Sequence, residues 1–161
     1  MATRANLLPY AAEFPSSNFP QLLLSNRRPA LAFDAATSET AYWTLIAPQD
    51  LASPYSVTIT YAMASATSGN VIFRAAVEAI TDGDATDTDA ATSFDTANSS
   101  ATTAVPATAG YIDQVAITLT TDDAVAAGDL VRISIDRDAA NGSDTATGDG
   151  YVLAVEFRDG A

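Results

Sequence analysis

The chain contains no cysteine, no histidine and no lysine among its 161 residues. Without cysteine, neither disulfide bonds nor thiolate metal sites can form. Because histidine and lysine are missing too, most nucleophile–base pairs and zinc sites have no residues to build them. The composition therefore predicts that this protein is not an enzyme and holds no cofactor.

Long apolar segments are missing as well. No run of residues approaches the ~20 that span a membrane, and the first ten residues lack the apolar core of a signal peptide. We therefore expect a soluble chain with no membrane partner, made inside a cell. A reducing compartment fits the absence of cysteine.

Positive charge is scarce. The seven positive charges are all arginines, and the formal net charge is -13. A surface this acidic repels phosphate backbones, so we expect no nucleic-acid partner. The acidic excess either keeps the chain soluble or matches a basic partner surface or divalent cations. Arginine as the sole cation suits bidentate contacts at an interface.

Apolar and polar residues alternate with a period of two along much of the chain, which is the pattern of half-buried β-strands. The clearest segments are residues 55–65 and 71–80. We expect them to form a hairpin around a turn at residues 67–70, where Gly69 or Asn70 takes a positive φ. The inward residues of the first segment are predicted to be Val57, Ile59, Tyr61 and Met63.

Further strands are expected at residues 30–34, 41–47, 93–97, 111–120, 130–137 and 150–158. In the strands at residues 111–120 and 130–137, the inward residues are predicted to be Val115, Ile117 and Leu119, and Val131, Ile133 and Ile135. In the last predicted strand, one face is predicted to carry Tyr151, Leu153, Val155 and Phe157. No segment has a sustained helical period, and turn residues separate the strands. The patterns predict an all-β fold, namely an antiparallel eight-stranded β-sandwich of the jelly-roll rather than the immunoglobulin-like kind.

We expect this β-sandwich domain to cover residues 30–161, preceded by an extended N-terminal arm of residues 1–29. Prolines at positions 9, 15, 20 and 29 prevent a continuous helix in the arm. Its large apolar side chains need burial, either against their own domain or on a neighbouring subunit or partner. The candidate partner-binding residues of the arm are Leu7, Leu8, Tyr10, Phe14, Phe19 and Leu22.

Arg27 and Arg28 lie beside this apolar segment and complete the set of candidate binding residues. Paired arginines can clamp a carboxylate on a partner. The alternative interpretation is that they form ion pairs within the chain, with Asp34 or Glu39.

The acidic residues offer two further possibilities. A glycosidase needs two carboxylates that flank a cleft, and Glu78 and Glu156 are the acids that lie within predicted strands. Both alternate with core residues, so we expect them on the outer, solvated face, which disfavours catalysis.

The aspartates of residues 82–89 and 136–149 either bind calcium through their oxygens or cap turns in solvated loops. Their spacing does not match that of an EF-hand calcium loop.

Four segments, taken in order, are similar to a known family. Residues 26–43, 61–69, 128–138 and 147–157 together resemble small jelly-roll proteins encoded among the virion genes of tailed bacteriophages, described as head decoration (cement) proteins or as fibre and tail accessory modules. The resemblance covers residues 26–158, and its motifs are fold-stabilising patterns rather than catalytic signatures. It implies a structural role as a homotrimer that clamps the major capsid protein at the capsid surface of a virion assembled in the host cytoplasm.

Two functions therefore lead. The first is a capsid decoration protein that stabilises a phage head. The second is a fibre or tail module that binds a receptor or glycan through loops at one end of the sandwich. Residues 81–109 and 139–150 contain Phe94 as their sole aromatic residue, so these loops are poor platforms for stacking on sugars. This composition favours the decoration protein.

Overall fold

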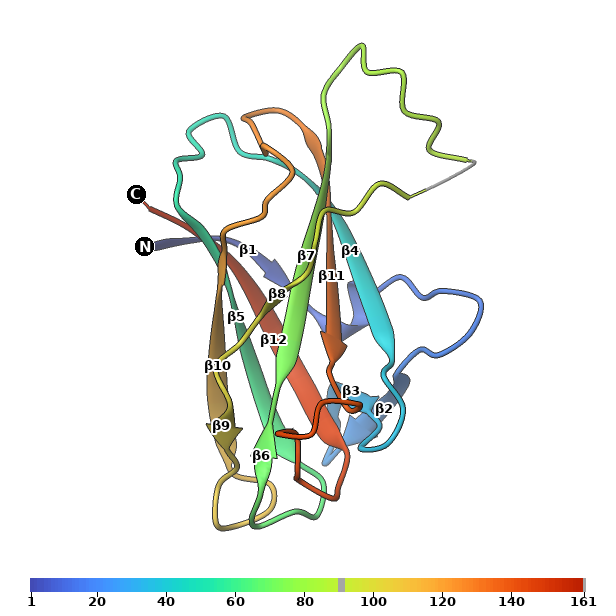
Figure 1. Cartoon of the computed structure of the whole chain (residues 1–161), viewed down its shortest axis with the longest axis vertical. Helices are drawn as coiled ribbons and strands as arrows, with labels where there is room; N and C mark the ends of the chain where they lie inside the picture. Colours follow the sequence, from blue (N-terminus) through green and yellow to red (C-terminus); the bar gives the residue numbers. More distant parts are fainter. Residues whose placement is uncertain (90–91, 161) are drawn as a thin grey trace.

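The computed structural model describes residues 1–89 and 92–160, and in them the chain is all-β with one 3-10 turn, η1 (Pro9–Ala11). No described helix is long and apolar enough to cross a membrane. Figure 1 shows the strands of the elongated molecule. They are β1 (Ala2–Leu7), β2 (Gln21–Ser25), β3 (Arg28–Phe33), β4 (Thr40–Ile46), β5 (Tyr55–Met63), β6 (Asn70–Val71), β7 (Phe73–Ile80), β8 (Asn98–Ser99), β9 (Thr103–Ala104), β10 (Ile112–Leu119), β11 (Leu130–Arg137) and β12 (Gly150–Asp159).

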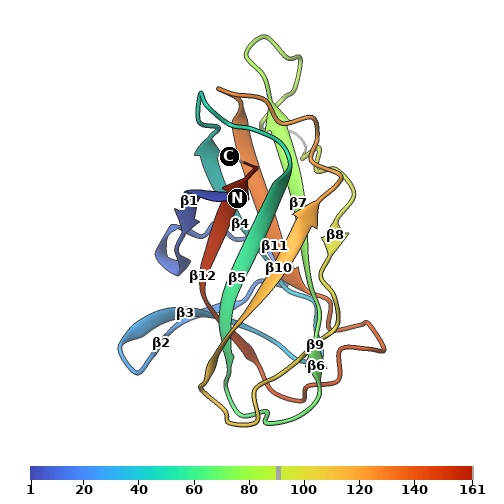
Figure 2. The same ribbon diagram turned by 90° about the vertical axis from the view of Figure 1, so that its left-hand side faces the viewer.

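Two antiparallel sheets pack face to face as a β-sandwich. Sheet A has six strands in the order β10-β5-β12-β3-β2, with β1 also paired to β12, and sheet B has four strands in the order β4-β11-β7-β8. Figure 2 shows sheet A in front of sheet B. A small third pair, β6 with β9, joins two loops at one end. The all-β sandwich predicted from the alternation is therefore confirmed.

The strand pairs of the two sheets are nested within one another along the chain. β3 pairs with β12, β4 with β11, β5 with β10, and β7 with β8, each pair antiparallel. The pair β3–β12 encloses the longest stretch of sequence, and each later pair lies within the previous one, down to β7–β8. Most contacts in the sandwich therefore join residues far apart in the chain.

The predicted hairpin of residues 55–80 is wrong. Its first arm, β5, lies in sheet A between β10 and β12, whereas its second arm, β7, lies in sheet B beside β11. The connection crosses between the sheets, and Gly69 has a φ of +92° there. A Cβ at Gly69 would lie 2.8 Å from the Ala146 nitrogen, so the crossing packs directly on the loop before β12. Alternation identifies each strand but not its neighbour, because both strands present an apolar face to the same core.

The core lies between the two sheets, and the predicted inward faces of β5, β10 and β11 are confirmed. Every one of their predicted inward residues is at most 3% exposed: Val57, Ile59, Tyr61, Met63, Val115, Ile117, Leu119, Val131, Ile133 and Ile135.

The predicted face of β12 is wrong in its first half. Val152, Val155 and Phe157 face the core, whereas Tyr151 and Leu153 are only half-buried. The register against β5 shifts between Val152 and Ala154, which marks a β-bulge at Leu153. An extra residue in one strand changes which side chains face inward beyond it. Tyr151 therefore stands on the outer side of sheet A.

The predicted strand at residues 93–97 is also wrong, because the described residues 92–97 form no strand and β8 begins at Asn98. The Asn98 side chain accepts hydrogen bonds from the Thr120 and Thr121 amides and donates to the Thr121 carbonyl. This amide ties β8 to the end of β10 and links the two sheets. The hydrogen bonds of the polar Asn98 side chain thus position β8, and a single polar residue leaves no alternating pattern in the sequence.

The extended N-terminal arm is not confirmed. Strand β1 pairs with β12 from Ala2 to Leu7, and β2 pairs with β3. Between them, residues 8–20 run along the edge of β4, where the Trp43 indole donates to the Leu8 carbonyl and Glu13 bridges to Tyr42. The first 29 residues thus share their sheet and core contacts with the rest of the sandwich.

Candidate partner-binding surface

The segment that connects β1 to the end of β2 exposes an unusual number of large apolar side chains. We call its six exposed members the N-terminal surface: Leu8, Tyr10, Phe14, Phe19, Leu22 and Leu24. The phenyl rings of Phe14 and Phe19 lie 5.7 Å apart, centroid to centroid. Of the residues predicted to bind a partner, Leu7 differs, because it is 5% exposed and belongs to the core. Prolines and apolar residues in the sequence marked this segment but did not separate its buried residues from its exposed ones.

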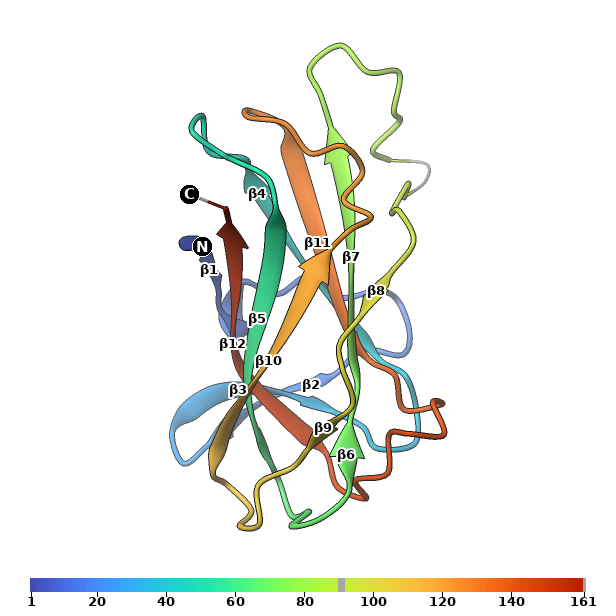
Figure 3. The same ribbon diagram turned by 60° about the vertical axis from the view of Figure 1, so that its left-hand side comes forward.

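Strands β2 and β3 form a two-stranded ribbon that projects from the side of the sandwich, as Figure 3 shows. Its turn consists of Asn26 and Arg27, whose φ angles are +46° and +68°. Both central residues of such a hairpin turn need positive φ, which favours Asn followed by Gly. An arginine in the left-handed region costs roughly 1–2 kcal/mol. The turn therefore holds a strained arginine where glycine would fit better.

Arg27 and Arg28 differ from the other arginines in their pairing. Among the described residues, both are exposed and neither forms an ion pair, so the alternative of intrachain pairs with Asp34 or Glu39 has no counterpart there. The other five arginines all pair with carboxylates: Arg4, Arg74, Arg132, Arg137 and Arg158.

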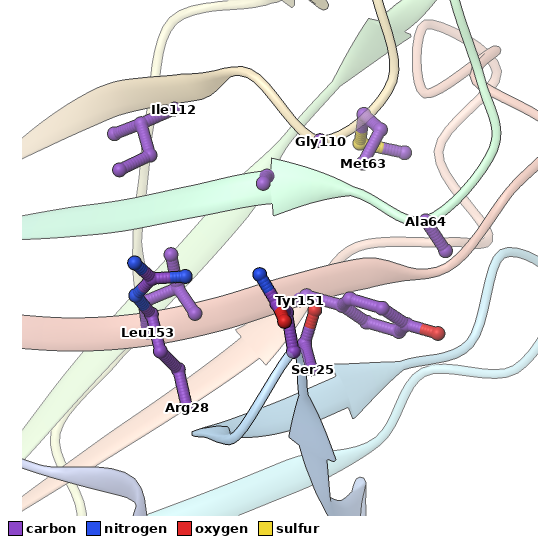
Figure 4. A pocket seen from close by; sticks show the side chains of 10 residues that line it. Ser25, Arg28, Met63, Ala64, Gly110, Ile112, Tyr151 and Leu153 are labelled. Carbon is purple, nitrogen blue, oxygen red and sulfur yellow. The ribbon is translucent and has the colours of Figure 1, made fainter.

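A hollow of about 440 Å³ opens beside the ribbon turn, on the outer side of sheet A. We call it the arginine hollow, because Arg28 lines it. Figure 4 shows the Arg28 side chain extending toward Leu153 on β12, with Tyr151 on the same strand and Ile112 on β10. The bulge in β12 creates this apolar floor by placing Tyr151 outside the core. A cation over an apolar floor suits a partner group that combines a carboxylate with apolar surface.

A second hollow, of about 360 Å³, lies at the opposite end of the ribbon beside Gln21 and Ala32. We call it the acidic hollow. Phe14 and Phe19 line it together with three carboxylates: Asp34, Glu39 and Asp149.

Two of the three carboxylates of the acidic hollow, Asp34 and Glu39, accept hydrogen bonds from backbone amides. Asp34 accepts hydrogen bonds from the Ala36 and Thr37 amides, which lower its pKa. Burial raises the pKa of Glu39, and the nearby charges of Asp34 and Asp149 raise it further. The three acids therefore repel one another, and a cation placed in the hollow would relieve that repulsion.

The two carboxylates considered for catalysis do not meet. Glu78 lies on β7 in sheet B and Glu156 on β12 in sheet A, each alternating with core residues, so they point away from opposite faces of the sandwich. The prediction that Glu78 is solvated is wrong, because it is 2% exposed. Its carboxylate accepts from the Ser93 amide and pairs with Arg132. Residues that fold back after the polar loop thus cover it.

Phe94, the aromatic residue of the long loops, is also engaged. Its ring stacks on Tyr42 at 5.4 Å between centroids, and the Arg132 guanidinium lies 5.4 Å from the Phe94 ring centre. This cluster lies against the outer side of sheet B rather than at a loop tip. Phe94 therefore contributes to packing and leaves the loop ends without an aromatic platform.

The acidic loops are arranged by hydrogen bonds and arginines. In the first loop, Asp84 accepts from the Thr81 amide and Asp87 from the Asp89 amide. In the second, Asp136 pairs with Arg74, and Asp144 with Arg137. No three acidic side chains converge as a metal site in the part of the chain that the structure describes.

Calcium is expected to leave the protein's melting temperature almost unchanged. A ligand that binds the folded state raises the melting temperature through mass action, so saturating calcium would stabilise a chain with a real site. Thermal unfolding with calcium and with a chelator measures the effect. A calcium-dependent rise above about 5 °C that Asp84→Ala abolishes would contradict this expectation.

No protein-family model matches the chain, and no curated protein matches it in sequence. The class of protein must therefore be inferred from the fold and from the surface described above.

Proposed function

We propose that this chain is a structural virion protein, a decoration or cement protein that binds the outer surface of a phage head and stabilises it. Its partner is the major capsid protein, and it acts as a homotrimer at the capsid surface. The resemblance of residues 26–158 to phage virion jelly-roll proteins suggests this role. The sandwich and its exposed surface support it independently.

The nested strand pairs support a jelly-roll topology. A jelly roll arises when a long antiparallel hairpin folds over itself, so that the first strand pairs with the last, the second with the second-last, and so on inward. The four pairs from β3–β12 to β7–β8 follow that scheme. Jelly rolls are common in viral capsid proteins and lectins.

The observation that carries the proposal is the N-terminal surface. Tyr10 is 67% exposed and Leu24 is 62% exposed, on a segment fixed to the sandwich by strands β1 and β2. Burying one large apolar side chain contributes about 1.5–3 kcal/mol, and extended apolar exposure is typical of surfaces that bind other proteins. Because the segment is already ordered, docking it on a capsid loses little further chain entropy.

Co-sedimentation with undecorated capsids of the encoding phage tests the proposal. We expect wild-type protein to pellet with capsids and Tyr10→Ser to lose about tenfold or more in affinity, since buried tyrosines are frequent interface hot spots. Tyr111→Ser is the matched control, because Tyr111 is 63% exposed on another part of the surface. It should bind like wild type.

Two results would contradict the proposal. One is wild-type protein that fails to pellet with capsids at any concentration tested. The other is binding to host cells or purified surface glycans instead, which would favour the fibre or tail module.

A further inference from the structure

The two ends of the β2–β3 ribbon carry opposite charge. The turn end bears Arg27 and Arg28, the two arginines without an ion pair among the described residues. The other end borders the acidic hollow, whose three carboxylates likewise form no ion pair among the described residues. In a chain of net charge -13, cations are scarce and carboxylates abundant. Two exposed arginines that pair with no described carboxylate are therefore the exception that needs an explanation.

The two ends cannot neutralise each other within one chain. Arg28 and Asp34 lie at opposite ends of β3 and are separated by six positions of extended chain, which is about 20 Å. An arginine side chain cannot cross that distance. The guanidinium groups of Arg27 and Arg28 therefore cannot reach the acidic hollow of their own chain.

The acidic hollow has the composition of an arginine site. Its carboxylates accept the planar fork of a guanidinium, and its two phenyl rings offer faces on which a guanidinium stacks. A volume of about 360 Å³ leaves room for such a side chain. The ribbon turn projects from the sandwich (Figure 3). It carries two exposed arginines, Arg27 and Arg28.

Strand β2 adds an apolar component to the same surface. It is an edge strand of sheet A, and its sequence, Gln-Leu-Leu-Leu-Ser, has no charge or proline to protect the edge. Leu22, which is 42% exposed, also borders the acidic hollow. Unprotected apolar edges usually pair with or are covered by another chain. The ribbon thus offers both apolar area and charge to one partner.

We propose that the partner is a second copy of this chain, whose Arg27 and Arg28 enter the acidic hollow of the first. The contact joins two different patches, and such a contact closes a ring when its rotation closes, as in the proposed homotrimer. The inference rests on the proposed homotrimer, for which it supplies the subunit contact. The strained arginine at position 27 is retained because the contact needs its charge. Elsewhere the strongly acidic surfaces of two copies repel, so this contact also fixes their orientation.

Two variants test the contact from its two sides. The turn variant combines Arg27→Gly and Arg28→Ser, and it restores the Asn-Gly sequence that the turn favours. The hollow variant combines Glu39→Gln and Asp149→Asn, which remove charge but keep shape and the hydrogen bond that Glu39 accepts from the Asp34 amide. Glu156→Gln, which neutralises a carboxylate outside both hollows, is the control. Sedimentation velocity measures the assembly state of each protein.

We expect wild type and Glu156→Gln to form trimers, and each double variant to weaken assembly by more than about thirtyfold, as loss of a buried charge partner does. An equimolar mixture of the turn and hollow variants should form a dimer, because one intact turn then meets one intact hollow. The melting temperature of the turn variant should be no lower than that of wild type. A loss of assembly in this variant would then not be due to a loss of folding.

A wild-type monomer, variants that assemble like wild type, or a mixture that stays monomeric would each overturn the inference. The outcome is distinguishable from failure of the proposed function. Capsid binding by wild type with assembly unaffected in both variants leaves the proposed function standing and removes this contact. Assembly that depends on the ribbon, without capsid binding by wild type, supports this contact and removes the proposed function.

Discussion

Replacing Arg137 with methionine is expected to lower the free energy of unfolding by about 3–5 kcal/mol. The Arg137 side chain is fully buried and pairs with Asp144, whose side chain is 1% exposed. It also donates to the carbonyls of Ala146 and Gly148, at 2.6 Å and 2.7 Å. Methionine would leave a buried carboxylate without its cation and two carbonyls without donors. The loop before β12, which Arg137 organises, would then lose its anchor.

Urea unfolding of Arg137→Met measures this loss. Arg158→Met is the control, because Arg158 pairs with Glu156 at 3.5 Å and both side chains are about one-third exposed. Exposed pairs contribute roughly 0–1 kcal/mol. If Arg137→Met unfolds within about 1 kcal/mol of wild type, the buried pair does not hold this loop.

Ile133→Ala is expected to lower the free energy of unfolding by about 2–5 kcal/mol. Ile133 is 0% exposed and lies in the middle of β11, opposite Trp43 on β4 and Val77 on β7. Removing its outer atoms leaves a cavity between the two sheets that neighbouring strands cannot collapse to fill. The loss measures how much the shared core contributes.

The matched control is Ile46→Ala, since Ile46 is 62% exposed and lies at the end of β4. Surface changes of this kind alter stability by less than about 0.5 kcal/mol. Equal effects of the two substitutions in urea unfolding would mean that the inward face of β11 is wrongly assigned.

The alternation of residues predicted most strands and their inward faces, because a period of two depends only on local sequence. It could not predict strand partners. β5 and β7 are close in sequence and both face the core, yet they lie in different sheets. The bulge at Leu153 was likewise invisible, because one inserted residue leaves alternation intact on both sides of it.

The candidate surface was predicted in part. The apolar residues of the N-terminal segment and the paired arginines were evident from composition. The sequence could not show that β1 and β2 pair within the sandwich, because prolines and leucines suit an edge strand and a free arm equally. It also could not reveal the hollows, which bring together residues such as Arg28, Ile112 and Leu153 from three strands.

Glu78 illustrates a different limit. Its alternation with core residues correctly placed it on the outer side of sheet B, but the outer side is covered there by residues that return after the acidic loop. Burial of an outward residue depends on where a distant segment folds back. Periodicity carries no information about that segment.

Cryo-microscopy of purified virions tests the central claim most directly, because it locates the protein on the particle without assuming which partner it binds. We predict density for the sandwich on the outer face of the head shell, in threefold clusters. In each cluster, the β2–β3 ribbon of one copy should reach its neighbour, and the N-terminal surface should meet the major capsid protein. Density confined to the tail or fibres, or a virion without this chain, would contradict the account.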